Sequence, residues 1–389
     1  MYINKEPALV IEYTDPVEGF KGWLVVDTLN HKLCAGGMRV QQGLSRDHLR
    51  DMARNMTLKM RIGGLRVDGA KSGINYDPLA PGKKAAVGRF LQAIKPYIQQ
   101  YYSMGPDLNM EMAELEVICQ GLGIPSPKMA RAHAQGWDLE YFLQRYEILH
   151  EKGNDYSVSR LRAGIGVAEA ALSTVRFIGI PYKQASVAIQ GFGFLARAAA
   201  YFLQKAGVNI VAVSDVHKSL ASETGQALDI TSLLQSKGIL LPDLEHEKDV
   251  RVSSPADIFT IPCDVLIPAA VENAITEEIA SRLAVRAVVP GANLAVTAEA
   301  ETILNERGIV VLPDFVVGCG GSLSMEGLFG PVDHPEPSAV LDFVKHKMAT
   351  LVADLLDRGK RENITPTMAA LRNCSEVVFT DRQKPYGKI

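Results

Sequence analysis

The sequence predicts an α/β protein of two domains, the second built on a doubly wound parallel sheet. A chain of 389 residues is long enough for two cores of ordinary size. From about residue 158 onward, short apolar runs rich in β-branched residues alternate with helical segments, as is typical of parallel strands covered by helices on both faces. We predict an N-terminal α/β domain over 1–157, a Rossmann-type nucleotide-binding domain over 158–334, and C-terminal helices over 335–389 that pack back on the first domain.

The first third of the chain mixes strands with helices. Apolar runs at 8–13 and 22–26 predict strands. Ser45 is a candidate N-cap for a helix with apolar side chains at helical spacing, and Gly63–Gly64 suits its end. Further helices are predicted over 83–100 and 111–123, and the segment from about 128 to 157 is predicted to be a connection with one short helix.

The second domain follows a regular alternation. Helices are predicted at 161–179 and 195–207, and strands at 185–191, 208–215, 263–270, 286–292 and 308–314. Long helical patterns then occupy 338–359 and 368–379.

Composition excludes several classes of protein. The chain is 47% hydrophobic and 22% charged, which excludes disorder of the whole chain, and its net charge of −3 does not favour nucleic acid or a membrane as partner. The five cysteines include no C-x-x-C pair, so we expect free thiols and no metal site. The start lacks a secretory signal pattern and no stretch reaches the ~18 apolar residues of a membrane span. We therefore expect a cytoplasmic protein.

A glycine fingerprint follows the strand predicted at 185–191. Gly191 and Gly193 allow a tight turn and close approach of a pyrophosphate, and Ala196 allows close packing of the following helix. Asp215 ends the next strand, 22 residues after Gly193, where an acid binds ribose hydroxyls. An acid there favours NAD over NADP, because the 2′-phosphate of NADP would meet a like charge. Lys218 lies nearby, and its positive charge works in the opposite direction. The alternative interpretation is an ordinary strand–turn–helix.

Two lysines and an aspartate in the first domain are candidates for chemistry. Lys71 stands among small residues in DGAKSG, where close backbone packing can desolvate the amine and lower its pKa toward that of a base. Lys59 ends the run MTLK, and Asp107 follows Gly-Pro at what looks like a strand end. The alternative is that all three are ordinary helix and turn residues.

These motifs together resemble a known family. MTLK, GAKSG, GPDLN, GFG, GAN and PDFxxxxGG occur in this order over most of the chain, and 128–157 is the main unmatched segment. The sequence is similar to the glutamate/leucine/phenylalanine/valine dehydrogenase family, nearer to the leucine and phenylalanine type. The resemblance implies reversible oxidative deamination of an L-amino acid to a 2-oxo acid and ammonia, with NAD as hydride acceptor, in a homo-oligomer associated through the first domain.

The resemblance also implies site residues. Lys59 would bind the substrate α-carboxylate, Lys71 would be the catalytic lysine, and Asp107 would move the proton of the amino group. The backbone at Gly36 and Gly37 would help to fix the substrate. Asn293 in the GAN turn would lie at the substrate and nicotinamide.

Two positions bear on the choice of amino acid. Relatives that take glutamate carry a lysine and a serine where this chain has Ala35 and Met325. A buried glutamate side chain would lack partners there, which disfavours glutamate. Gly105 stands where alanine is frequent and, like Ala35, would enlarge the pocket. We expect an apolar or aromatic substrate.

The chain departs from the family pattern at several positions. Asp68 replaces a glycine before the catalytic lysine, and a nearby carboxylate would raise the pKa of Lys71. Ala163, Gly318 and Phe194 also replace usual residues. Two further hypotheses therefore stay open: a nicotinamide-dependent reductase of another imine or oxo substrate, and a non-catalytic nucleotide-binding member.

Overall fold

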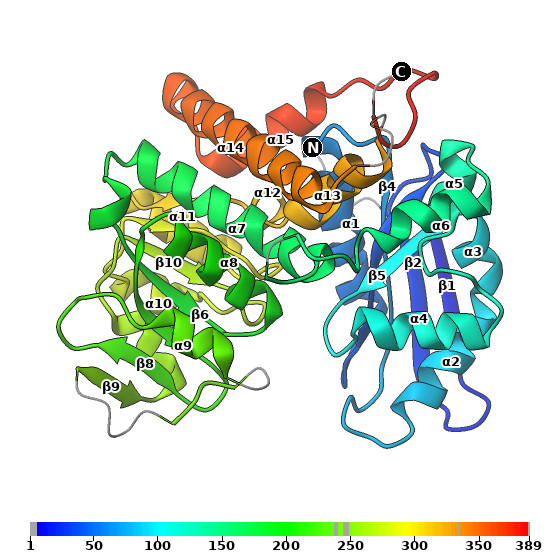
Figure 1. Cartoon of the computed structure of the whole chain (residues 1–389), viewed down its shortest axis with the longest axis horizontal. Coiled ribbons are helices and arrows are strands. Elements are labelled where there is room, and N and C mark those ends of the chain that lie inside the picture. Colours follow the sequence, from blue (N-terminus) through cyan, green and yellow to red (C-terminus); the bar gives the residue numbers. More distant parts are fainter. Residues whose placement is uncertain are drawn as a thin grey trace. The chain divides into compact units, whose positions relative to one another are not determined.

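The computed structural model describes residues 6–153, 155–236, 240–243, 249–330, 332 and 335–387. The chain forms two compact units (Figure 1). The first comprises Met1–Glu147, Phe329–Asp333 and Val377–Ile389, and the second comprises Ile148–Leu328 and His334–Glu376. None of the described helices is long and apolar enough to span a bilayer.

The first unit is built on a mixed five-stranded sheet of order β1-β2-β4-β3-β5. Strand β2 pairs antiparallel with β1 and β4, whereas β3 pairs parallel with β4 and β5. The carboxyl ends of β3, β4 and β5 therefore lie along one edge of the sheet. The strands are β1 (Leu9–Thr14), β2 (Lys21–Val26), β3 (Cys34–Val40), β4 (Asp68–Ile74) and β5 (Tyr102–Pro106).

Helices cover both faces of this sheet. Helix α1 (Arg46–Ile62) packs Leu49 and Ala53 against Trp23 and Val25 on one face. The larger core on the other face includes Phe90 of α2 and Ile118 of α4. The remaining helices of this unit are short. The bounds are α2 (Lys83–Ala93), α3 (Lys95–Gln100), α4 (Met112–Gly121), α5 (Ala130–Gln135) and α6 (Leu139–Glu147).

Helix α1 has the ends that the sequence predicts. Ser45 is its N-cap and accepts a hydrogen bond from the backbone N–H of His48 at 3.2 Å. Gly63 is its C-cap, and Gly64 follows with a φ of +73°, a conformation that favours glycine.

Two predictions for the first unit are wrong in detail. The helix predicted over 83–100 is broken at Ile94, because Pro96 cannot donate a backbone hydrogen bond to the preceding turn. The 128–157 segment contains two helices, α5 and α6, rather than one.

The second unit has a seven-stranded sheet of order β12-β11-β10-β6-β7-β8-β9. The five strands from β12 to β7 pair in parallel, as the sequence predicts. Strands β8 and β9 add an antiparallel edge that the sequence analysis did not anticipate. The strands are β6 (Ser186–Gln190), β7 (Asn209–Ser214), β8 (Ser219–Ser222), β9 (Val250–Ser253), β10 (Val265–Pro268), β11 (Ala287–Val288) and β12 (Val310–Val311).

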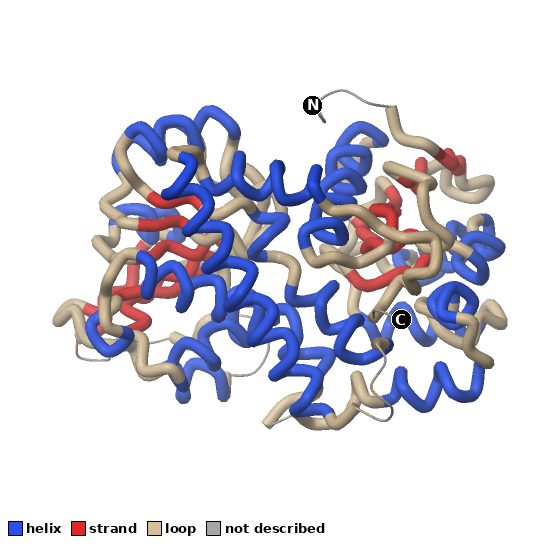
Figure 2. The backbone as a smooth tube through the Cα atoms, turned by 90° about the horizontal axis from the view of Figure 1, so that it is seen from above, coloured by secondary structure: helices blue, strands red, loops and turns tan. Residues whose placement is uncertain are grey.

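The strands of the second unit run between helices (Figure 2). On one face, Leu266 and Val288 pack in a core with Ala280 of α10 and Leu304 of α11. Helices α7 and α8 contact the sheet and pack on each other. The helices before residue 330 are α7 (Val158–Phe177), α8 (Phe194–Lys205), α9 (Ile230–Gln235), α10 (Glu277–Arg282), α11 (Ala298–Glu306), α12 (Asp314–Val317) and α13 (Gly320–Phe329), with single 3₁₀ segments at Tyr182–Gln184 and Pro255–Thr260.

The C-terminal helices differ from the sequence prediction. Helix α14 (Pro337–Glu362) packs along α7, and α15 (Pro366–Glu376) packs on α14, so both belong to the second unit. Only the segment from Val377 onward belongs to the first unit. Helix α14 buries apolar side chains against α7, the first helix of the second unit, and therefore does not pack back on the first unit.

Candidate active site

The two lysines singled out in the sequence come from neighbouring elements of the first unit. Lys59 lies in the last turn of α1, and Lys71 lies in the middle of β4, the central strand. Helix α1 packs directly on β4 because Gly69 has no side chain: a Cβ there would lie 2.2 Å from the backbone N of Thr57. Both lysines are buried, Lys71 at 3% and Lys59 at 7% exposure.

Asp107 faces the same site from the loop after β5. Its Oδ2 lies 2.9 Å from Nζ of Lys71 and 2.8 Å from Nε of Arg39. One carboxylate oxygen therefore receives two cationic donors. Arg39 lies in β3 two residues after Gly37 and was not predicted as a site residue from the sequence. Its place in the motif GGMR was the available signal.

Burial and charge set the protonation of this cluster. Burial has the largest effect on Lys71 and lowers its pKa; Asp107 opposes this, while Arg39 and Lys59 add to it. Burial alone would raise the pKa of Asp107, but the charges of Lys71 and Arg39 outweigh it and hold this pKa well below its usual range. The site thus combines an ionised carboxylate with an amine that is easier to deprotonate than an ordinary lysine.

Asp68 does not lie beside Lys71. The two residues are three apart in β4, so their side chains point to opposite faces of the sheet. The Asp68 carboxylate accepts hydrogen bonds from the hydroxyl of Thr28 and from the backbone N–H of His31 at 2.7 Å. Burial raises the pKa of Asp68 itself. This departure from the family pattern leaves the face of β4 that carries Lys71 unchanged.

Glycines form the floor of the site. Gly37 is buried against Lys71 and Asp107: a Cβ there would lie 2.8 Å from Cβ of Asp107 and 3.4 Å from Nζ of Lys71. At Gly36 a Cβ would lie 1.6 Å from the carbonyl oxygen of Ala70, so only glycine allows β3 and β4 to pair. Ala35 precedes them in β3 and is buried.

Gly105 does not simply enlarge the site. A Cβ at Gly105 would lie 3.4 Å from Nζ of Lys128, which is buried and donates to the carbonyl of Met104 at 3.0 Å. The register pairs Gly105 with Gly37, so both positions face the same side of the sheet as Lys71. An ammonium group therefore bounds the space that the missing methyl leaves.

In the second unit, the fingerprint forms the strand–turn–helix that a dinucleotide requires. Gly191 has a φ of +87°, and a Cβ there would lie 2.7 Å from Cβ of Ala270. Gly193 is the N-cap of α8, with no heavy atom within 4 Å of where its Cβ would be. Ala196 is fully buried in α8. The open N-terminus of this twelve-residue helix fits a pyrophosphate.

The loops after the parallel strands converge at the same edge. The loop after β6 meets the loop after β10 at Gly191 and Ala270. The loop after β11 meets both, since a Cβ at Gly291 would lie 3.0 Å from Leu195 and 3.1 Å from Cβ of Ala269. Ligands bind at this edge in open α/β sheets. The chain therefore has a cradle suited to a nicotinamide dinucleotide.

Asp215 follows β7 and is held by backbone amides. One carboxylate oxygen accepts from the N–H groups of His217 and Lys218 at 2.8 and 2.9 Å, and the other from Leu241 at 2.7 Å. Burial alone would raise the pKa of Asp215, but these hydrogen bonds outweigh it and lower the pKa. Its negative charge is thus fixed at the end of β7. Lys218 turns toward Asp243, 3.7 Å away.

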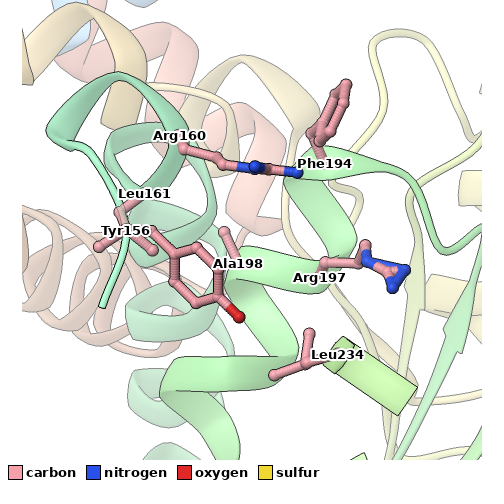
Figure 3. A pocket seen from close by; sticks show the side chains of 7 residues that line it. All are labelled: Tyr156, Arg160, Leu161, Phe194, Arg197, Ala198 and Leu234. Carbon is pink, nitrogen blue, oxygen red and sulfur yellow. The ribbon is translucent and has the colours of Figure 1, made fainter. Parts of the chain in front are cut away.

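A small cavity lies beside the start of α8 (Figure 3). Its volume is about 40 Å³, far below that of a nucleotide. The guanidinium of Arg160 stacks 4.8 Å from the ring of Phe194, and Arg197 donates to Ser236 and to the carbonyl of Leu233. Phe194, which replaces a usual polar residue, thus serves as a support for Arg160.

The remaining predicted residues also lie in the second unit. Asn293 lies in the turn after β11, next to Leu294, whose N–H donates to Asp314 at 2.6 Å. Met325 is buried in α13. Within the residues described, no group of three or more histidine, cysteine, aspartate or glutamate side chains is arranged to hold a metal ion.

Known proteins of similar sequence are amino-acid dehydrogenases. The glutamate dehydrogenase of Thermotoga maritima is 30% identical over 78% of this chain and 71% of its own length. The NADP-specific enzyme of Saccharolobus shibatae is 28% identical (81% and 74% covered), and the NAD-specific enzyme of Clostridioides difficile is 27% identical (82% and 76%).

Solved structures share the fold. A hetero-hexameric glutamate dehydrogenase from Thermus thermophilus superposes with a TM-score of 0.75 at 24% identity, covering 95% of this chain and 88% of that one. An L-tryptophan dehydrogenase from Nostoc punctiforme gives a TM-score of 0.60 at 16% identity, with 95% of each chain covered.

Family membership rests on matches to both parts of the chain. The family model described as Glutamate/Leucine/Phenylalanine/Valine dehydrogenase matches residues 158–378, and the model of its dimerisation domain matches residues 7–122. With the lysine–aspartate cluster in the first unit and the dinucleotide cradle in the second, the chain belongs to the glutamate/leucine/phenylalanine/valine dehydrogenase family of oxidoreductases.

Proposed function

We propose that the protein catalyses the reversible, NAD-dependent oxidative deamination of an apolar or aromatic L-amino acid. The reaction converts the amino acid, water and NAD⁺ to the 2-oxo acid, ammonium, NADH and one proton. The observation that carries the proposal is the 2.9 Å contact between Lys71 and Asp107 in a buried site of this family. An acid–base pair at this distance can pass the protons that deamination requires.

Each member of the cluster has a role in this scheme. Lys59 binds the α-carboxylate of the substrate as a buried cation. Ionised Asp107 takes the proton of the substrate ammonium, so that the nitrogen lone pair can assist loss of hydride from Cα. Lys71, with its lowered pKa, activates the water that attacks the resulting imine carbon. Arg39 positions Asp107 and keeps it ionised.

The cradle at β6 and α8 would hold the dinucleotide, which accepts the hydride when bound. Gly191 and Gly193 leave room for the pyrophosphate beside the N-terminus of α8. The fixed charge of Asp215 supports NAD over NADP, because a 2′-phosphate would meet a like charge. Relatives of both cofactor types exist, so the cofactor is part of the proposal.

The substrate class is inferred from Ala35. This buried methyl group stands where glutamate-specific relatives carry a lysine, and a side-chain carboxylate would meet no charge at this position. Leaving a buried carboxylate unpaired costs several kcal/mol. An apolar side chain incurs no such cost.

A second candidate is an amino acid with an acidic side chain. It is favoured by one observation: the ammonium of Lys128 reaches the edge of the same face of the sheet, 3.4 Å from the position of a Cβ at Gly105. This lysine comes from the loop before α5 rather than from β3. It could bind a carboxylate directly, or an aromatic ring through a cation–π contact.

The test is a substrate panel. NADH oxidation is followed with ammonia and phenylpyruvate, indolepyruvate, 4-methyl-2-oxopentanoate or 2-oxoglutarate, in the wild type and in Lys71→Ala, with exposed Lys84→Ala as the matched control. We expect turnover of an apolar oxo acid, a loss of roughly 100- to 10,000-fold in Lys71→Ala, and none in Lys84→Ala. Lys128→Met then separates the candidates: it abolishes 2-oxoglutarate turnover if the side chain is acidic.

The alternatives give different results. The highest kcat/KM with 2-oxoglutarate would refute the apolar class. Ammonia-independent oxidation of NADH would identify a reductase of another oxo substrate. Binding of NADH without turnover in the wild type would identify a non-catalytic member of the family.

Assembly and location complete the proposal. We infer a homo-oligomer associated through the first domain, supported by the match to the family's dimerisation domain. A cytoplasmic location is supported by the five cysteines, all of which are free thiols. A sedimentation experiment tests the assembly.

A further inference from the structure

We propose that the first unit carries a second ligand site, separate from the substrate and cofactor, for a small phosphate ester. The site is a cavity of about 320 Å³, within the range of small-molecule sites and too large for inorganic phosphate alone. It is formed by two segments that precede strands, by Ala134 of α5 and by the C-terminal tail. The lining residues are His31, Lys32, Arg66, Ala134, Asp381, Arg382, Gln383, Lys384 and Pro385.

The charge of the cavity selects an anion. Four of its side chains are lysine or arginine and one, Asp381, is acidic. The whole chain carries a net charge of −3, so this concentration of positive charge is local. Several cations around one cavity favour a dianion over a single carboxylate, and arginine in particular matches phosphate oxygens with paired donors.

Two lining side chains have buried polar atoms without a partner. Nδ1 of His31 and Nε of Arg66 are inaccessible to solvent and make no hydrogen bond within the described structure. Buried polar atoms normally find a partner, so these two lining side chains keep unused hydrogen-bonding capacity, which a ligand oxygen or hydroxyl would satisfy once the side chains turn toward it. Burial lowers the pKa of His31, so its imidazole can donate from one nitrogen and accept at the other.

The tail is fixed where it forms the wall of the cavity. Nη1 of Arg66 donates to the carbonyl oxygens of Asp381 and Gln383 at 3.0 and 2.8 Å. Beyond the wall, Gln135 donates to the carbonyl of Tyr386 and accepts from its N–H. Arg382 and Lys384 lie on this anchored segment and are exposed. Their charges can therefore be removed without disturbing the fold.

The cavity is remote from Asp107 of the candidate active site. His31 and Lys32 precede β3 and Arg66 precedes β4, so the cavity lies at the amino edge of these parallel strands. Asp107 follows the carboxyl end of β5 at the opposite edge. A strand of seven residues such as β4 separates the two edges by roughly 20 Å. A ligand in the cavity therefore cannot contact Asp107, as the substrate of the proposed reaction must.

The experiment measures binding of ribose 5-phosphate, with ribose and inorganic phosphate for comparison, by calorimetry in the presence of saturating NADH. NADH occupies the dinucleotide cradle, so any remaining binding is elsewhere. The test variant is Arg382→Ala/Lys384→Ala. The matched control is Lys84→Ala/Lys345→Ala, which removes two exposed positive charges from residues that do not line the cavity. Hydrogen exchange of residues 377–387 reports on the tail.

We expect ribose 5-phosphate to bind to the wild type in the presence of NADH and to slow hydrogen exchange of the tail. It should bind at least tenfold more weakly to the test variant than to the wild type or the control variant. Ribose should not bind, and inorganic phosphate should compete weakly. Displacement by NADH, equal affinity for both double variants, or no binding of any phosphate would overturn the proposal. Each result is independent of whether the enzyme deaminates amino acids.

Discussion

Gly37→Ala tests the geometry of the active site without removing a functional group. The new Cβ would lie 2.8 Å from Cβ of Asp107, whereas ordinary contact begins near 3.4 Å. Relief of this contact displaces Asp107 by about 0.6 Å from Lys71 and Arg39. Since a misplacement of ~1 Å can cost ~100-fold in rate, we expect kcat to fall at least ~10-fold. Overpacking should lower the free energy of unfolding by about 1–3 kcal/mol.

Two other glycines provide controls for this variant. Gly121→Ala places a methyl group in open space at the end of α4 and should leave both rate and stability unchanged or slightly improved. Gly36→Ala places Cβ 1.6 Å from the backbone of Ala70 and should prevent folding. The assays are NADH oxidation with the best oxo acid and thermal unfolding by circular dichroism. A folded Gly37→Ala enzyme with wild-type kcat would refute the proposed placement of the acid–base pair.

Three further variants test the charged side chains of Arg39, Asp215 and Asp68. Arg39→Met removes one of the two cations on Asp107, so the pKa of Asp107 should rise and the acidic limb of the kcat/KM profile should move to higher pH. Arg39→Lys should move this limb part of the way back, and an unchanged profile in Arg39→Met would contradict the role of Arg39. Asp215→Ser removes the carboxylate that would repel the 2′-phosphate of NADPH. The kcat/KM for NADPH, divided by the kcat/KM for NADH, should therefore rise roughly tenfold. A constant ratio would show that Asp215 does not face the ribose. Asp68→Asn should lower the free energy of unfolding by about 1–3 kcal/mol through its lost hydrogen bonds, while the limb of the pH profile that Lys71 sets stays in place. Movement of that limb would show that the two charges interact.

The sequence predicts the second unit better than the first. Parallel strands such as β6 and β7 are short continuous apolar runs that alternate with helical segments, and this pattern is easily recognised. In contrast, β3 and β4 carry the glycine-rich sequences CAGGMRV and DGAKSGI, which have low strand propensity. Their small residues allow β3 and β4 to pair with each other and α1 to pack closely on β4. These contacts make the two segments strands, and local sequence does not show such tertiary contacts.

The candidate site shows the same limit. Motif order was sufficient to name Lys59, Lys71 and Asp107, and family membership is confirmed by the matched regions. The role of Arg39 depends on the pairing of β3 with both β4 and β5, which brings three strands to one carboxylate. Similarly, the approach of Lys128 to Gly105 crosses the sheet edge from a segment that motifs did not match.

The return of the tail to the first unit has a consequence for biosynthesis. Arg61 donates to the carbonyl of Val377, and Gln135 binds the backbone of Tyr386, so residues far apart in the chain complete one core. The guanidinium of Arg131 is covered by the rings of Phe329 and Tyr386. A nascent chain on the ribosome can build the nucleotide-binding sheet early, yet it must expose this buried arginine until residue 386 has emerged. Maturation of the first unit, which carries the candidate active site, is therefore among the last events of synthesis.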